Sequence, residues 1–94
     1  MSYFERITAK ISAAFPSAEI RLEDQSNRHA GHAGAKPGGE THFFLEVIAP
    51  EFEGLNRVER QRKVHDLLKA ELDERVHALS LRLKTPAESQ KPLS

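Results

Sequence analysis

The chain has 94 residues, the size of one domain, and its 14 basic and 14 acidic side chains leave no net charge. This balance gives no whole-molecule reason to expect nucleic acid, an anionic membrane or another polyanion as a partner. Because cysteine is missing from the sequence, disulfides, a catalytic thiol and metal sites built on thiolates of this chain are excluded. No segment reads as a secretory signal or a membrane span, so we expect a cytoplasmic protein. We also expect the chain to be a monomer when it is alone.

The first predicted element is a helix. Ser2-Tyr3-Phe4-Glu5 fits a capping box, in which the serine hydroxyl and the glutamate side chain satisfy free amides of the first turn. Phe4, Ile7 and Ile11 then recur at three- and four-residue steps, which is typical of one buried helix face. Pro16 ends the helix.

Two strands separated by a long loop are predicted next. Residues 18–24 alternate between apolar and charged side chains, which indicates a half-exposed strand. Residues 25–41 are rich in glycine, alanine and polar residues, carry His29 and His32, and show no periodicity, so we expect a mobile loop. Residues 42–49 are aromatic and β-branched, which favours the central strand of a sheet.

A main helix follows the central strand. It begins at a second capping box, Asn56-Arg57-Val58-Glu59, and its apolar residues continue at helical spacing as far as Leu72. The first two turns carry four cations, Arg57, Arg60, Arg62 and Lys63. Since helix N-termini favour anions, contact with nucleic-acid phosphates is one interpretation. A solvated face with pairs such as Glu59–Lys63 is the more common one.

The chain closes with a strand and a short helix. Residues 76–83 predict the last strand, with His77 in the same phase as the leucines of the core face. Residues 85–88 repeat the capping pattern with proline at the first helical position, and residues 89–94 read as a flexible tail. The expected order is therefore α-β-β-α-β with a short C-terminal helix.

Histidine is the main chemical feature of the sequence. His77 stands at the start of a strand, where it is either a partly buried residue bonded to a backbone carbonyl or an available ligand. His29 and His32 are most simply surface residues, and their His-x-x-His spacing is a weak zinc pattern. The chain contains neither a Gly-x-Ser-x-Gly elbow nor a phosphate-binding P-loop, so we do not expect an enzyme.

Five segments taken together resemble the BolA family, over essentially the whole chain as far as Glu88. They are Thr41-His42-Phe43, Phe52-Glu53-Gly54-Leu55, Arg60-Gln61-Arg62-Lys63-Val64, Val76-His77-Ala78-Leu79 and Thr85-Pro86. The resemblance implies an α/β (α+β) domain over residues 1–88 that is similar to the class II KH fold. Such a fold has a three-stranded mixed sheet with helices packed on one face.

The resemblance also implies a function. BolA-like proteins are accessory factors that form a heterodimer with a monothiol glutaredoxin of the Cys-Gly-Phe-Ser type around a bridging [2Fe–2S] cluster. Carried over by position, His77 is the expected metal ligand and His29 the loop ligand. His32 is the alternative, because residues 31–36 look inserted. Two imidazoles here and thiolates from the partner would divide the ligands as in a Rieske centre.

Two further functions stay open at this point. Some bacterial members of the family are stress-responsive, DNA-binding transcription regulators, which makes DNA binding through Arg57, Arg60, Arg62 and Lys63 the alternative. The family usually has histidine where this chain has Gln61, so this position is assigned no role. A histidine loop that sequesters zinc or nickel is a third hypothesis.

Overall fold

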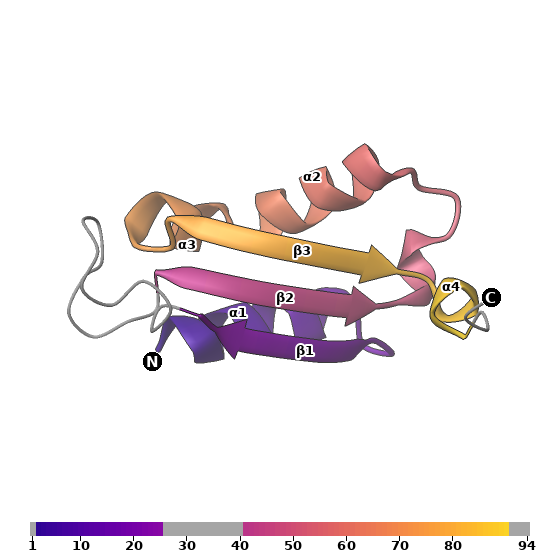
Figure 1. Ribbon diagram of the computed structural model, residues 1–94, viewed down its shortest axis with the longest axis horizontal. Coiled ribbons are helices and arrows are strands. Elements are labelled where there is room, and N and C mark those ends of the chain that lie inside the picture. Colours follow the sequence, from indigo (N-terminus) through magenta and orange to yellow (C-terminus); the bar gives the residue numbers. More distant parts are fainter. Residues whose placement is uncertain (1, 26–40, 91–94) are drawn as a thin grey trace.

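The computed structural model describes residues 2–25 and 41–90 as a three-stranded sheet with helices (Figure 1). The elements are α1 (Tyr3–Ala14), β1 (Glu19–Asp24), β2 (His42–Ile48), η2 (Pro50–Phe52), α2 (Arg57–Leu67), α3 (Lys69–Glu74), β3 (Ala78–Lys84) and α4 (Pro86–Ser89). The strands lie in the order β1-β2-β3, with β1 antiparallel and β3 parallel to β2. The predicted fold class, element order and mixed sheet are confirmed.

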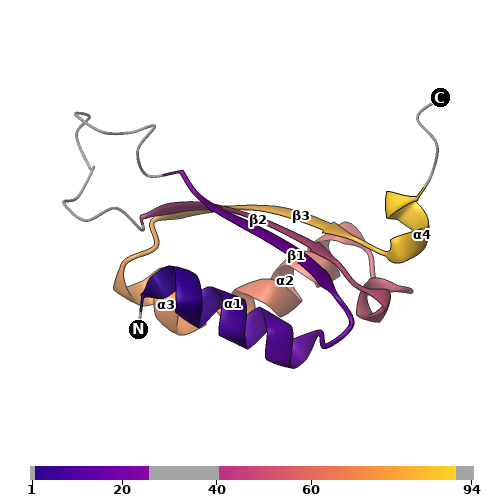
Figure 2. The same cartoon turned by 90° about the horizontal axis from the view of Figure 1, so that it is seen from below.

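The sheet is covered on one face. Figure 2 shows α1, α2 and α3 together beneath the strands, with none of the described helices on the opposite face. Along β2 the side chains alternate strictly, so that Phe43, Leu45 and Val47 are buried against the helices. Ile7 and Ile11 of α1 pack onto them. The strand expected over residues 42–49 is therefore the central strand of the sheet, and its buried side chains form part of the core.

The main helix differs from the sequence expectation. The expectation of a single helix through Leu72 is wrong. The helix breaks at Leu68, whose φ of −105° and ψ of 16° lie outside the helical range. Its amide is shared between the carbonyls of Val64 and His65 at 3.1 and 3.2 Å. Leu68 is itself buried in the core, and α3 continues beyond it against α1.

A buried carboxylate joins α3 to α1. The side chain of Glu71 is only 1% exposed, and Lys10 Nζ donates to its Oε1 at 2.8 Å. Arg6 Nε donates to its Oε2 at 2.9 Å. Burial alone would raise the pKa of Glu71, but the hydrogen bond from Lys10, a backbone hydrogen bond and Arg6 outweigh it and lower the pKa below its ordinary value of 4.5.

The capping boxes predicted at Asn56 and Thr85 are complete, whereas at Ser2 only the serine half is present, because Ser2 Oγ itself donates to Glu5 Oε1 at 3.2 Å. The Glu5 amide donates to Ser2 Oγ at 3.0 Å, and the Glu59 amide donates to Asn56 Oδ1 at 2.9 Å. Around α4 the Thr85 amide donates to a Glu88 carboxylate oxygen at 2.8 Å and completes a capping box. These local bonds fix where three of the helices start.

We expect replacement of Glu71 by Gln to lower the free energy of unfolding by about 2 kcal/mol at pH 7, because it removes the charge that two cations face at a buried position. The pKa of the folded carboxyl lies below that of the unfolded one. Its contribution is therefore complete above the unfolded pKa and is lost as the pH falls through the folded pKa.

Chemical denaturation between pH 7 and pH 3 measures both effects. The matched control is Glu53→Gln, at an exposed glutamate that makes no ion pair within the described residues. An unfolding free energy of Glu71→Gln that matches this control across the range would contradict the stabilising role of the buried carboxylate.

Candidate functional site

His77 lies between α3 and β3 and is exposed. Its amide donates to the Thr41 carbonyl at 2.8 Å, and the Ala78 amide donates to the same oxygen at 3.1 Å. The expected strand start at residue 76 and the core-facing phase of His77 are wrong. The Val76 amide donates to the Glu71 carbonyl at 3.0 Å, so Val76 still closes α3 and enters the core in place of the histidine.

Three chain segments meet at this end of the sheet. The Gln25 amide donates to the His42 carbonyl at 2.7 Å, which joins the end of β1 to the start of β2. Thr41 is buried, and its hydroxyl lies 2.8 Å from Nδ1 of His42. The backbone that carries His77 is therefore held in place while its imidazole remains open to solvent. His42 lies at the start of β2, where its ring is bonded to the Thr41 hydroxyl.

The loop candidates His29 and His32 lie outside the described residues, in the segment 26–40. This segment joins Gln25 to Thr41, and both of these anchor residues lie at the His77 end of the sheet. His29 as the loop ligand, with His32 as the alternative, therefore stays a prediction.

The described residues do not form a complete metal site by themselves. Within 2–25 and 41–90, no group of three or more His, Cys, Asp or Glu side chains is arranged to hold a metal ion. Any metal at His77 therefore needs ligands from the segment 26–40 or from a partner.

Within the same described residues, no helix has the length and apolar character needed to cross a membrane.

The four cations predicted to contact nucleic acid separate into two kinds. Arg57, Arg62 and Lys63 are exposed on α2. Arg60 has a side chain only 13% exposed and donates to the carbonyls of Leu55 and Leu83 at 2.9 and 3.2 Å. Its guanidinium therefore binds the protein itself.

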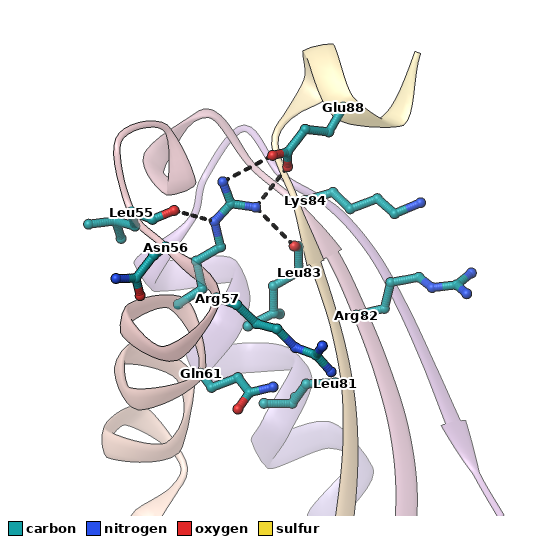
Figure 3. Close-up of a pocket in the computed structure, with 10 residues that line it drawn as sticks. Leu55, Asn56, Arg57, Gln61, Leu81, Arg82, Leu83, Lys84 and Glu88 are labelled. Atoms are coloured by element: carbon teal, nitrogen blue, oxygen red, sulfur yellow. Dashed lines mark hydrogen bonds and ion pairs between the residues drawn. The ribbon is translucent and has the colours of Figure 1, made fainter. Parts of the chain in front are cut away.

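Arg60 also holds α4 in place. Its Nη1 donates to Glu88 Oε1 at 2.7 Å and its Nη2 to Oε2 at 3.2 Å, and these bonds are drawn in Figure 3. The hydrogen bonds from Arg60, together with that from the Thr85 backbone, lower the pKa of Glu88 to about 2.

The chain enters α2 through Gly54, whose φ of 80° favours glycine.

Sequence reasoning missed a hollow between α2 and β3. It has a volume of about 680 Å³ and is lined by Leu55, Asn56, Arg57, Arg60, Gln61, Leu81, Arg82, Leu83, Lys84 and Glu88 (Figure 3). The cations that line it come from α2 and from β3, more than 20 residues apart. The only signal in the sequence was the polar phase of the last strand, which carries Arg82.

Comparisons with known proteins point to one family. Residues 11–88 match the family described as "BolA: BolA-like protein". The chain is 45% identical to "Protein BOLA1, chloroplastic" of Arabidopsis thaliana over 89% of its length, but spans only 54% of that relative. It is 42% identical to "SufE-like protein 1, chloroplastic/mitochondrial" of the same plant over 88% of its length and spans 24% of it.

Solved structures give the same result. BolA1 from A. thaliana superposes with a TM-score of 0.84 at 41% identity, with 98% of each chain covered. The BolA domain of SufE1 from A. thaliana gives a TM-score of 0.81 at 40% identity, covering 94% of this chain and 98% of that domain. The similarity to SufE1 therefore lies in its BolA domain.

We expect Arg60→Ala to lower the free energy of unfolding by about 2 kcal/mol, because the Leu55 and Leu83 carbonyls and the Glu88 carboxylate all lose a charged donor. Arg62→Ala, at an exposed arginine of the same helix, should stay within about 0.5 kcal/mol of the parent. Denaturation measures the difference, and amide hydrogen exchange should rise in α4 for Arg60→Ala alone. Equal effects of the two variants would contradict the assignment.

Proposed function

Because the chain belongs to the BolA-like protein family, we propose that it is a non-enzymatic accessory protein that binds a monothiol glutaredoxin of the Cys-Gly-Phe-Ser type. The two proteins would share a bridging [2Fe–2S] cluster, for iron–sulfur trafficking or for iron and redox regulation. The similarity to a BolA domain of SufE1 is consistent with a role related to iron–sulfur clusters.

The observation that carries the proposal is the exposed imidazole of His77 on a fixed backbone. Its peptide amide is bonded to the buried Thr41, so little main-chain freedom remains to be lost when the ring binds. The chain has no cysteine, so thiolate ligands would have to come from the partner. Imidazole and thiolate are both ligands that iron–sulfur centres accept.

The residues of this chain would have separate tasks. His77 would supply one neutral imidazole, and His29, or His32 in its place, would supply the second from the segment 26–40. Thr41 would position His77, because its carbonyl accepts the His77 amide and so fixes the backbone that carries the imidazole. A cluster held in this way would be shared by the two proteins, and either of them could release it.

Replacement of His77 by Ala should alter the visible absorption and circular dichroism of the complex formed with a cluster-loaded monothiol glutaredoxin, and should speed the loss of its cluster. The physical reason is that one iron loses a nitrogen donor. His65→Ala is the matched control, because His65 is also exposed but lies on α2. A spectrum and a cluster lifetime equal to those of the control would remove His77 from the site.

The loop ligand is tested by replacing His29 and His32 with Ala, one at a time. We expect one of the two variants to reproduce the spectral change of His77→Ala and the other to behave like the parent. If both single variants keep the parent spectrum, no loop histidine is a ligand and the two-imidazole arrangement fails.

DNA binding by a stress-responsive regulator is the second candidate function. The supporting observation is that Arg57, Arg62 and Lys63 are exposed on one helix, with Glu59 occupied by the cap of Asn56. Phosphate contacts by such cations bring affinity that depends on salt rather than on base sequence. Arg60 is excluded from this surface by its bonds to the protein.

We expect replacement of Arg57, Arg62 and Lys63 together by Ala to weaken any affinity for duplex DNA for all sequences alike. The slope of log affinity against log salt should fall by up to about 2.7, since each lost phosphate contact contributes about 0.9. Fluorescence anisotropy over a salt series measures it. DNA affinity that survives the triple change would place the nucleic-acid surface elsewhere.

A further inference from the structure

The free edge of β3 offers unpaired backbone groups. β3 is one of the two outer strands of the sheet, and the Ala78 amide and the Lys84 carbonyl are both bonded toward β2. Backbone groups of alternate residues in a strand point to opposite edges, so Leu79, Leu81 and Leu83 direct theirs outward. The bond from Arg60 to the Leu83 carbonyl at 3.2 Å agrees with this phase.

Arg60 protects only one end of this edge. It occupies the Leu83 carbonyl and, with Glu88, closes the space beside α4. Among the described residues, the amides and carbonyls of Leu79 and Leu81 have no hydrogen-bond partner outside the strand. A hydrogen-bonding edge with one blocked end is a template for pairing with a single short extended segment.

The two faces beside this edge have different chemistry. On the helix side, Leu81 and Leu83 are half-buried and, with Leu55, give the hollow its aliphatic lining. Figure 3 shows Arg82 and Lys84 projecting from β3 away from α2. Lys84 makes no ion pair within the described residues, and Arg82 reaches Glu46 only at 3.8 Å.

We propose that this space, the edge groove between α2 and β3, binds an extended peptide segment of a partner protein that pairs with β3 as a fourth strand. The segment alternates aliphatic and acidic side chains. Its aliphatic residues face the leucines under α2, and its acidic residues lie across from Arg82 and Lys84 on the open face. The volume of about 680 Å³ is in the range of ordinary binding sites.

The observations favour a peptide over two other occupants. The aliphatic side chains of Leu81 and Leu83 and the free strand edge would add little to the affinity for a nucleic acid. No aromatic side chain lines the hollow for a base to stack on. A second copy of this chain paired edge to edge about Leu83 would bring Arg82 of one copy opposite Lys84 of the other, and like charges across a strand pair are destabilising.

The experiment uses the apo protein and a capped eight-residue peptide of alternating Val and Glu. We expect the peptide to shift the NMR signals of the Leu79 and Leu81 amides and to slow their hydrogen exchange. Two further peptides carry N-methyl groups, on the valines in one and on the glutamates in the other. At least one of them should bind about tenfold more weakly, because strand pairing loses its donors.

Charge is tested on the protein side. Lys84→Glu should weaken binding of the Val–Glu peptide about fivefold and improve binding of a Val–Lys peptide, whereas Lys69→Glu on α3 should change neither. The proposal is overturned if both methylated peptides bind like the parent peptide, or if millimolar peptide causes no shift at Leu79 and Leu81. It is also overturned if a single-stranded oligonucleotide of equal charge gives the same shifts at lower concentration, or if these amides are already protected by self-association.

Discussion

The carbonyl oxygen of Thr41 fixes the arrangement of the sheet. It accepts the amides of both His77 and Ala78, so β3 can join β2 in parallel only from Ala78 onward. That starting point sets the phase of every later residue. Leu79, Leu81 and Leu83 face the helices, and Arg82 lies on the open face of the sheet. Thr41 can do this because it is itself buried directly before β2, whose alternate residues form the core.

The fold was predictable to the extent that it is local. Alternation in β2, the apolar spacing in α1 and the capping residues Asn56 and Thr85 depend on near neighbours, and each is present in the structure. The break at Leu68 and the start of β3 depend on partners distant in sequence. The bond from Ala78 joins residues 37 positions apart, so no pattern around His77 could show that it precedes the strand.

The basic start of α2 shows the same limit for the candidate site. In sequence, Arg57, Arg60 and Arg62 are equivalent members of one charge run. In the structure, Arg60 is separated from the others by Leu83 and Glu88, which lie 23 and 28 residues later. The guanidinium of Arg60 donates to two backbone carbonyls and one carboxylate and so stabilises the fold, whereas Arg57 and Arg62 are exposed to solvent. His77 was identified by resemblance, and the structure adds that it is exposed.

His77 and the Lys84 end of the edge groove lie at opposite ends of β3, which makes their charges electrostatically separate. Seven residues of strand span roughly 20 Å, more than twice the screening length of about 8 Å at physiological salt. A charge gained or lost near Lys84 is therefore little felt at His77. What the two ends share is the register of β3, and this is held by Thr41 at one end and by the bond from Arg60 to Leu83 at the other. A partner that pairs with the strand edge would add hydrogen bonds to the same register rather than compete with it.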